Sequence, residues 1–412
     1  MRIAVAGGGA AGFFGAISAA THNSSAEITL FESTHKPLHK VLISGGGRCN
    51  VTYHCFDPAE LARNYPRGNK ELLGPFNRFQ PSDTVAWFEK QGVRLKVEQD
   101  GRMFPVTNQS STVVDCLLNA ARASGVQVRL GARVKSIQAA VAAKDAPQFE
   151  IELQDGVRQR YDRLLLATGS SPHGHRLAET LGHTIVPCVP SLFTFKVTDS
   201  RLDGLAGISF ENVKLTLTDN DKNQLEQSGG LLITHWGLSG PAVLKLSAWG
   251  ARMLQRSNYK AELLINLLPD YSADHLYREL LAYKEQNSRK RVQKEPVFPV
   301  PGRYWSRIVQ FVGIAEETTW TNVSKGALTA LVSELSGGRF AVSGKGIFKE
   351  EFVTCGGVNL KEVDFKTMQS KLSPGLYFAG EVLDIDGITG GFNFQSAWTT
   401  GWIAGSSIVS LG

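Results

Sequence analysis

The chain has 412 residues, of which 42% are hydrophobic and 20% are charged, and its formal net charge at pH 7 is +6. This is the composition of an ordinary globular protein with room for two or three domains, and it excludes disordered, collagen-like and low-complexity classes. No apolar run reaches the roughly 18 residues that a transmembrane helix needs. The apolar N-terminus is interrupted by Gly7, Gly8 and Gly9. We therefore expect no signal peptide, no membrane segment and a cytoplasmic protein.

The first predicted element is a buried strand over residues 1–7, followed by a turn and a helix over residues 7–22. The glycines in this turn have the spacing Gly7-x-Gly9-x-x-Gly12, which is typical of dinucleotide-binding sites. In that motif Gly7 forms the tight turn, Gly9 lets the backbone approach a pyrophosphate, and Gly12 allows the helix to pack closely on the strand. The N-terminus therefore predicts a Rossmann-like nucleotide site.

The start of this helix and the end of the next strand supply the first predicted ligand contacts. Unpaired amides at Ala10 and Ala11 lie where a helix N-terminus attracts a pyrophosphate. The next predicted strand, 27–32, ends at Glu32, which is 20 residues beyond the last glycine of the motif. A carboxylate there accepts hydrogen bonds from ribose hydroxyls and repels a 2′-phosphate. We therefore expect FAD or NAD at Glu32 and Ser33, and we do not expect NADP.

A second glycine cluster, LISGGGRCNVT, follows at residues 42–52. Glycine-rich turns allow a backbone to approach a ligand closely. Two such clusters about 30 residues apart indicate one long, phosphate-bearing ligand that spans both.

Three later segments favour FAD over NAD. The predicted strand 131–137 places Val134 where it can contact an adenine ring, and the strand in 161–171 runs into a sharp turn at Thr168 and Gly169. Residues 375–405 then form another strand, a glycine-rich loop and a helix. A chain that returns to its nucleotide domain at the C-terminus covers a flavin, whereas a plain NAD dehydrogenase has no reason to return.

In the middle of the chain, the spacing of the apolar residues changes from a strand-like pattern to a helix-like pattern. We expect strands and then helices, over residues 191–197, 212–218, 231–236, 274–287, 304–314 and 324–335. The proline-rich segment 295–302 is interpreted as a linker between helices.

The five cysteines argue against a disulfide framework and against a zinc site. Their number is odd, and no C-x-x-C pair is present. We therefore expect no bound metal.

The chain resembles the bacterial flavoproteins described as NAD(P)/FAD-dependent oxidoreductases or aminoacetone-oxidase-family FAD-binding enzymes, some of which are bile-acid Δ4-reductases. The resemblance runs over nearly the whole length. Its most specific pieces are residues 43–52, the segment THWGLSGPAVLKLSAW at 234–249, and the run from Thr354 to Gln395.

The resemblance implies an α/β fold with a Rossmann-like FAD-binding domain built from both chain ends, and with inserted β-barrel-like and helical domains. On this basis we expect the FAD-binding domain at 1–188 and 341–412, the β-rich insert at 189–268 and the helical insert at 269–340. The loop at 170–183 is shorter than in many relatives, so substrate contacts from that loop are not carried over.

The resemblance also assigns further cofactor contacts to two segments. The first is the second glycine cluster, whose amides form an anion-binding nest, with an arginine that neutralises a phosphate or a substrate carboxylate or carbonyl and an asparagine that anchors the loop. The second is the C-terminal return. The residues are Lys40, Gly45, Gly46, Arg48, Cys49 and Asn50 in the first set, and Gly380, Glu381, Asp386, Gly391, Phe392, Asn393, Phe394 and Gln395 in the second.

Two side chains have alternative interpretations, so no catalytic residue is assigned. Cys49 is either a small buried side chain under the flavin, which we prefer because a partner thiol is missing, or a catalytic thiol. His235 is either satisfied by local packing, which we again prefer, or a proton donor near the substrate.

We predict an FAD-dependent oxidoreductase that acts on a small organic substrate, by reduction of a conjugated C=C bond or by oxidation of an amine or ketone. NADH or NADPH would dock only transiently, because no second glycine fingerprint follows the turn at 167–169. One alternative is an RNA-associated flavoprotein, based on the basic run SRKRVQK at 288–294, although we expect this run to be a solvated surface and nucleic acid not to be a partner. The other alternative is a flavin-binding protein without catalysis.

Overall fold

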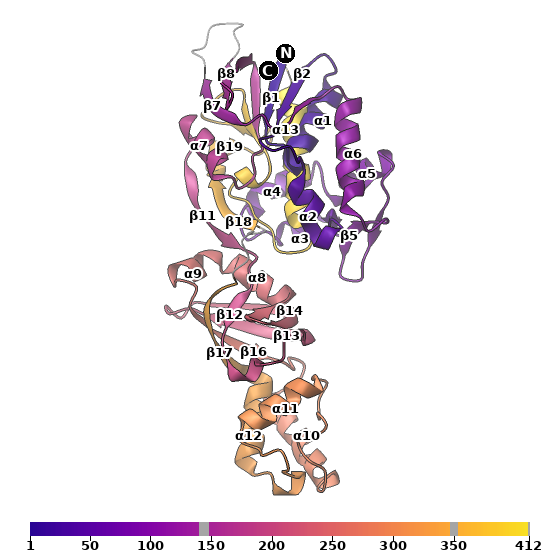
Figure 1. Ribbon diagram of the computed structural model, residues 1–412, viewed down its shortest axis with the longest axis vertical. Helices are drawn as coiled ribbons and strands as arrows, with labels where there is room; N and C mark the ends of the chain where they lie inside the picture. Colours follow the sequence, from indigo (N-terminus) through magenta and orange to yellow (C-terminus); the bar gives the residue numbers. More distant parts are fainter. Residues whose placement is uncertain (140–147, 347–352, 411–412) are drawn as a thin grey trace. The chain divides into compact units, whose positions relative to one another are not determined.

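The computed structural model describes residues 1–139, 148–346 and 353–410, and the chain divides into two compact units (Figure 1). Unit 1 comprises Met1–Cys188 and Val353–Gly412, and unit 2 comprises Val189–Phe352. Unit 1 is thus built from both ends of the chain, as the predicted fold class requires.

Unit 1 is organised around a seven-stranded sheet in the order β19-β20-β21-β10-β1-β2-β6. These strands are β1 (Arg2–Ala6), β2 (Glu27–Phe31), β6 (Gln127–Arg129), β10 (Arg163–Leu166), β19 (Val363–Asp364), β20 (Gln369–Ser370) and β21 (Leu376–Phe378). The run from β21 to β6 is parallel, and β19 and β20 are antiparallel at one edge. β21 pairs with β10, with Leu164 opposite Leu376. The end of the chain therefore completes the sheet that its beginning starts.

Two helices from opposite ends of the chain pack against each other in unit 1. They are α1 (Ala10–His22) and α13 (Phe392–Ile408). A Cβ added at Gly405 would lie 2.3 Å from the carbonyl oxygen of Gly15, so glycine is required for this close contact. The two helices cover strands whose residues are almost all apolar and buried, as in parallel sheets covered on both faces.

The remaining elements of unit 1 surround this core. The helices are α2 (His39–Gly47), α3 (Pro58–Ala62), α4 (Asn69–Phe76), α5 (Pro81–Lys90), α6 (Ser110–Ala123), α7 (Pro172–Thr180), η3 (Leu360–Glu362) and η4 (Gly380–Val382). The strands are β3 (Thr52–Tyr53), β4 (Leu95–Val97), β5 (Arg102–Pro105), β7 (Val134–Ala139), β8 (Phe149–Leu153), β9 (Arg158–Tyr161), β11 (Ile185–Ser191) and β18 (Val353–Val358). They form sheets in the orders β3-β5-β4, β7-β8-β9 and β11-β18.

Unit 2 contains a closed barrel in the order β12-β15-β14-β13-β16-β17. Its strands are β12 (Phe195–Val197), β13 (Ser209–Thr218), β14 (Gln224–Thr234), β15 (Gly237–Ser239), β16 (Ala261–Asn266) and β17 (Gly338–Lys345). Its helices are α8 (Pro241–Trp249), α9 (Ala251–Arg256), α10 (Ala273–Gln286), α11 (Gly302–Phe311), α12 (Lys325–Gly337), η1 (Ser200–Leu202) and η2 (Trp320–Asn322). The predicted β-barrel-like insert is therefore a true barrel.

The predicted elements of unit 2 agree with the structure except at their edges. The strand expected over 191–197 is divided, because β11 ends at Ser191 and Leu192 has a φ of 58°. β17 pairs with β12 and β16 in the barrel, so residues 338–345 belong with unit 2 although we expected the FAD-binding domain to resume at 341. Barrel and helices share one hydrophobic core, because apolar side chains of both pack in the same cluster. Among the described residues, no helix has both the length and the hydropathy to cross a membrane.

Candidate cofactor-binding site

A cavity of about 400 Å³ lies in unit 1 next to the segments that directly follow β1, β2, β10 and β21. In an open α/β sheet, ligands bind outside the carboxyl ends of the strands. The cavity brings together many of the predicted contact residues. They are Gly7, Gly9, Ala10, Ala11, Glu32, Ser33, Lys40, Thr168, Gly169, Gly380, Glu381, Asn393 and Phe394.

The first glycine motif has a different spatial role at each position. Gly7 has a φ of 116°, and a Cβ there would lie 2.3 Å from the carbonyl oxygen of Ala167. A Cβ on Gly12 would lie 1.9 Å from the carbonyl oxygen of Gly7, so this glycine packs inside the fold and does not line the cavity. A Cβ on Gly9, the N-cap of α1, would meet no described atom within 4 Å. Gly9 therefore leaves bare backbone beside the cavity at a helix N-terminus, where an anion can approach.

The Glu32 side chain is held by backbone amides from two segments that line the cavity. Its Oε2 accepts a hydrogen bond from the Gly8 amide at 2.9 Å, and its Oε1 accepts one from the Thr34 amide at 2.7 Å. The Ser33 and Thr34 hydroxyls also donate to Oε1, at 3.2 and 2.9 Å. A carboxylate has about four acceptor positions, two on each oxygen. Glu32 is therefore held in place with Oε1 fully occupied, and Oε2, which accepts only the Gly8 amide, keeps capacity for a ribose hydroxyl.

The turn after β10 leaves a buried polar atom without a partner. The Thr168 Oγ1 makes no hydrogen bond with any described residue, although it is buried, and Thr168 lines the cavity. Gly169, next to it, has a φ of 60°. An orphaned hydroxyl at a cavity wall is a place where a ligand atom can complete a hydrogen bond.

Lys40 and Glu381 form an ion pair between two walls of the cavity. The Lys40 Nζ on α2 lies 2.9 Å from the Glu381 Oε2 in η4, and both residues line the cavity. Without Lys40, the Glu381 carboxylate would stand unbalanced in a cavity that suits an anionic ligand. The ion pair therefore removes a repulsion that would otherwise oppose a pyrophosphate.

We expect Lys40→Met to weaken FAD binding about tenfold, because it exposes the cofactor to the Glu381 charge. The double variant Lys40→Met/Glu381→Gln should recover most of the lost affinity, since it removes that charge. Calorimetric titration of the apoprotein measures both. If the double variant binds as weakly as Lys40→Met, Lys40 acts directly on the cofactor and not by balancing Glu381.

The second glycine cluster forms the end of α2, which has non-helical backbone from Ser44 to Gly46. Gly45, Gly46 and Gly47 have φ values of 56°, 67° and 82°, the left-handed region that glycine adopts without strain. A Cβ on Gly46 or Gly47 would meet no described atom within 4 Å. The cluster thus presents bare backbone to open space, but it does not line the cavity itself.

Asn50 connects this cluster to the N-terminus of α13. Its Oδ1 is buried, and no hydrogen bond to it from a described residue is present. The same atom lies 2.9 Å from where a Cβ on Gly391, the N-cap of α13, would be. Asn50 therefore offers a second unfilled acceptor, beside the helix whose Asn393 and Phe394 line the cavity.

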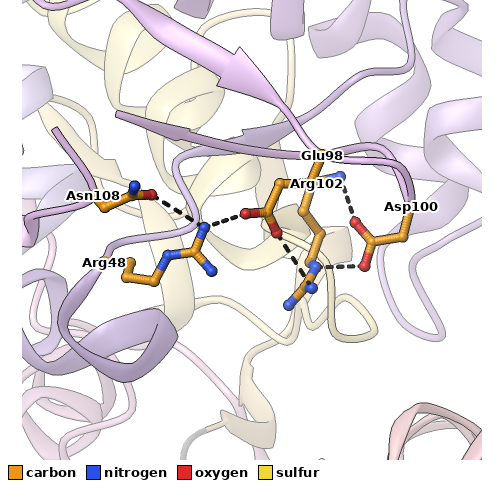
Figure 2. Close-up of polar contacts among 5 residues, drawn as sticks. All are labelled: Arg48, Glu98, Asp100, Arg102 and Asn108. Carbon is orange, nitrogen blue, oxygen red and sulfur yellow. Dashed lines mark hydrogen bonds and ion pairs between the residues drawn. The ribbon is translucent and has the colours of Figure 1, made fainter. Parts of the chain in front are cut away.

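Arg48 points to a cluster of charged side chains and not to the cavity (Figure 2). Its guanidinium pairs with Glu98 and donates to the Asn108 Oδ1 at 3.2 Å. It also lies over the Phe104 ring, 4.0 Å from the centroid. Glu98 in turn lies 3.5 Å from Arg102. In this structure the Glu98 carboxylate pairs with Arg48.

Cys49 lies in the core with a φ of 57° and no exposed surface. Burial raises the pKa of its thiol to about 12, and a hydrogen bond with Ser44 offsets only part of this effect. The thiol is therefore protonated at neutral pH, which makes it a poor nucleophile. This geometry favours the structural interpretation of Cys49.

We expect Cys49→Ser to retain most of the flavin reduction rate. The thiol should also resist iodoacetamide at pH 8 in the native protein, because the reactive thiolate form is disfavoured by burial. Stopped-flow absorbance and mass spectrometry of labelled peptides measure these effects, and the exposed Cys188 serves as the internal control. A loss of turnover above roughly a hundredfold with FAD still bound would make Cys49 catalytic.

Several predicted contact residues lie outside the cavity in other environments. Val134 is buried in β7, and its carbonyl accepts a hydrogen bond from the His173 Nε2 at 2.6 Å. Asp386 is fully buried in an ion pair with Arg67. These contacts hold the fold together.

Phe392 and Gln395 are likewise held by protein contacts. The Phe392 carbonyl accepts a hydrogen bond from the Tyr65 hydroxyl at 2.6 Å. The Gln395 Oε1 accepts hydrogen bonds from Thr52 at 2.6 Å and Thr84 at 2.9 Å. Both residues therefore anchor the first turn of α13.

The cavity also contains residues that sequence reasoning missed. The loop between β2 and α2 contributes Thr34, Lys36 and Leu38, and His39 is the first residue of α2. The Leu38 amide donates to the Gly8 carbonyl at 2.8 Å, which brings this loop against the glycine turn. The only sequence signal was the proximity of these residues to Lys40, and no motif includes them.

The residues present fit a dinucleotide. The bare backbone at Gly9 leaves room for a pyrophosphate, Glu32 suits a ribose, and the buried Thr168 and Asn50 oxygens lack partners among the described residues. No three His, Cys, Asp or Glu side chains among the described residues are grouped as metal ligands. His235 is exposed in unit 2 on the turn between β14 and β15.

The chain is similar to known proteins over nearly its whole length. The family model described as the HI0933-like protein Rossmann domain matches residues 1–407. The chain is 29% identical to the ribosomal RNA dihydrouridine synthase of Escherichia coli (strain K12) over 414 residues, which cover 98% of this chain and 97% of the relative. It is 28% identical to the 3-dehydro-bile acid delta(4,6)-reductase of Clostridium scindens over 412 residues, with 98% of each chain covered.

Two solved structures share the fold. A flavocytochrome c3 fumarate reductase matches with a TM-score of 0.50 and 17% identity over 99% of this chain and 78% of that chain. The 3-ketosteroid delta1-dehydrogenase from Sterolibacterium denitrificans matches with a TM-score of 0.50 and 12% identity over 99% of both chains. Since the family model covers nearly all of the sequence, this chain belongs to the HI0933-like Rossmann family of FAD-binding flavoproteins.

Proposed function

We propose that this protein is an FAD-dependent reductase that saturates a carbon–carbon double bond conjugated to a carbonyl group. The observation that carries the proposal is the cavity at the carboxyl edge of the sheet, whose walls come from both ends of the chain. That construction suits a flavin dinucleotide, because a pyrophosphate at α1 leaves the rest of the ligand to extend along the start of α13 toward Asn50.

The names of two relatives support reduction over oxidation. A dihydrouridine synthase forms a uracil ring whose double bond, conjugated to a ring carbonyl, has gained two hydrogens. A delta(4,6)-reductase of a 3-dehydro bile acid removes unsaturation conjugated to a ketone. The two substrates share little except this conjugated carbonyl. We therefore favour that chemistry over amine or ketone oxidation.

The residues of the chain bind and orient. Amides at the start of α1 would bind the pyrophosphate beside Gly9, and Glu32 would accept hydrogen bonds from the ribose. The N-terminus of α13 places a partial positive charge beside the same cavity. Bound FAD supplies hydride transfer, and the protein supplies position and electrostatics.

The nicotinamide donor should bind weakly and with little preference between NADH and NADPH. No second glycine fingerprint exists in the sequence, so no dedicated acid or arginine is available to sense the 2′-position. We expect apparent affinities in roughly the upper-micromolar range or weaker. The dependence of anaerobic flavin reduction on NADH and NADPH concentration measures this. Tight, selective use of one nucleotide would contradict the prediction.

RNA is the second candidate substrate class. The sequence did not lead us to expect a nucleic acid partner, but a relative of 29% identity is named for a reaction on ribosomal RNA. A uracil base is a conjugated carbonyl compound, so the same chemistry applies to it. A flavin-binding protein without catalysis is the remaining alternative.

The test uses protein reconstituted with FAD and reduced anaerobically. Mixing with a conjugated enone should reoxidise the flavin, and the matched saturated ketone should not. The released cofactor, identified by mass spectrometry, should be FAD at close to one per chain. Reduction of oxidised flavin by amines, with no reaction toward enones or uridine-containing RNA, would replace the proposed reaction by oxidation. Failure with all donors and acceptors would favour the non-catalytic alternative.

A further inference from the structure

The exposed face of α8 and α9 in unit 2 carries cations and a tryptophan at helical spacing. Lys245, Trp249, Arg252 and Arg256 follow one another at intervals of four, three and four residues. Residues three and four apart lie on the same face of a helix. Lys245 and Trp249 therefore share a face of α8, and Arg252 and Arg256 share a face of α9. We call these four side chains together the α8–α9 face.

α8 and α9 are two helices that meet at Gly250, whose ψ of 8° is outside the helical range. The Gly250 amide donates to the Leu246 carbonyl at 2.8 Å, and the Leu254 amide donates to the Gly250 carbonyl at 2.8 Å. The first bond closes α8 and the second opens α9. Helical spacing therefore holds between Lys245 and Trp249 on α8, and between Arg252 and Arg256 on α9.

The two sides of these helices differ sharply in burial. Trp249 is 36% exposed, Arg256 is exposed, and Lys245 and Arg252 are partly exposed. The opposite side packs into the core of unit 2 through Ala242, Val243, Leu246, Met253 and Leu254. The apolar side of the two helices therefore makes the contacts with the core of unit 2, and the α8–α9 face is not part of that core.

The segment that contains this face has no acidic residue. Between Glu226 and Glu262 the sequence has four Lys or Arg and no Asp or Glu. The acid that acts on Arg256 is Asp219, whose pKa is lowered mainly by a hydrogen bond from Asn223 and to a smaller extent by Arg256. Its carboxylate also accepts hydrogen bonds from the amides of Asp221 and Asn223 in its own turn. The segment from residue 227 to residue 261 is therefore cationic.

The basic run at 288–294, which is denser in the sequence, is less cationic in space. Lys290 lies 3.3 Å from Glu295, and Arg291 pairs with Glu317. Glu295 and Glu317 thus balance part of its charge. The run at 288–294 therefore carries less unbalanced positive charge in the folded chain than its sequence suggests.

We propose that the α8–α9 face binds single-stranded RNA, with phosphates on Lys245 and Arg256 and an unpaired base stacked on Trp249. Cationic side chains interleaved with an exposed aromatic ring are the usual combination for single-stranded nucleic acid. Paired bases do not offer their faces to a side chain, which favours an unpaired strand. The inference rests on the second candidate in the proposed function, RNA as substrate, since a reductase that acts on uracil in RNA needs a surface that holds the strand.

The test measures fluorescence anisotropy of a labelled oligouridylate with the FAD-loaded full chain over a range of salt concentrations. Lys245→Ala/Arg256→Ala should weaken binding about tenfold at low salt and reduce the slope of log affinity against log salt by about 1.4, which is two phosphate contacts at about 0.7 each. Trp249→Ala should weaken binding by a similar factor, about 1.4 kcal/mol, with an unchanged slope.

The matched control is Arg289→Ala/Lys294→Ala, which removes two cations from the run at 288–294 and should leave the affinity within about twofold. Each variant is checked for FAD content and circular dichroism. If Arg289→Ala/Lys294→Ala bound RNA weakly while Lys245→Ala/Arg256→Ala bound it normally, RNA would lie on residues 288–294 and the proposal would be overturned. Equal binding of heparin, with no effect of Trp249→Ala, would also overturn it, as would absence of binding by the wild type at low salt.

The two proposals fail separately. Enone-dependent flavin reoxidation should be unchanged in Lys245→Ala/Arg256→Ala, because neither residue lines the cofactor cavity. If the wild type reduced the enone normally but did not bind RNA, the proposed RNA-binding surface alone would be refuted. RNA binding without enone or uridine reduction would refute the proposed reaction alone.

Discussion

Replacement of Gly9 by alanine is expected to weaken FAD binding by roughly a hundredfold, or about 2.8 kcal/mol, while the apoprotein stays as stable as the wild type. The φ of Gly9 is −93°, which alanine adopts freely, and the added Cβ would meet no described atom within 4 Å. The methyl group would instead occupy the space beside the α1 N-terminus that a pyrophosphate needs. Calorimetry with FAD and thermal unfolding of the apoprotein measure the two effects.

The matched control is Gly12→Ala, three residues further along the same motif. Its Cβ would lie 1.9 Å from the Gly7 carbonyl oxygen, so the helix must move away from the strand. We expect this variant to lose about 1–3 kcal/mol of stability in the absence of FAD, as is typical of overpacking. If Gly9→Ala bound FAD normally, the pyrophosphate would not lie at this turn.

Glu32→Ala should produce the second large effect, a loss of FAD affinity of about ten- to a hundredfold. Hydrogen bonds to a charged group contribute about 1.5–3 kcal/mol each. The substitution also releases the Gly8 and Thr34 amides that Glu32 binds at 2.9 and 2.7 Å, so the turn itself loses support. Calorimetric titration of the apoprotein with FAD measures the change.

Two further variants separate these contributions. Glu32→Gln keeps one carbonyl acceptor without the charge and should fall between the wild type and alanine. Ser33→Ala removes only a hydroxyl that donates to the same carboxylate at 3.2 Å, and it should bind FAD nearly as well as the wild type. Equal FAD retention in Glu32→Ala and the wild type would show that Glu32 is not at the ribose.

The local sequence pattern was sufficient to predict the parts of the site whose residues are adjacent in the chain. The strand, turn and helix from Arg2 to His22 follow from a short apolar run and three glycines, because each of these residues acts on its immediate neighbours. Glu32 follows from the length of one βαβ unit. The return of the C-terminus as β21 and α13 could also be predicted, since strand and helix are again encoded by adjacent residues.

Other features depended on partners far away in the chain. Asp386 resembles a cofactor ligand in sequence, but the structure pairs it with Arg67 inside the fold. Arg48 follows the glycine cluster, yet its charge is neutralised by Glu98 on another segment. The choice between a ligand and a protein partner is made by whichever opposite charge the fold brings within reach, and no local pattern contains that information.

The sequence by itself thus determined the Rossmann-type nucleotide turn, the acid at Glu32 and a domain closed by both chain ends. Only the tertiary structure decided that Lys40 balances Glu381, 341 residues away, and that unit 2 presents its cations on α8 and α9. The physical reason is the distance along the chain between the residues that interact. Backbone conformation and amphipathic spacing arise from residues a few positions apart, whereas ion pairs, burial and cavities arise from segments that meet only after the chain has folded.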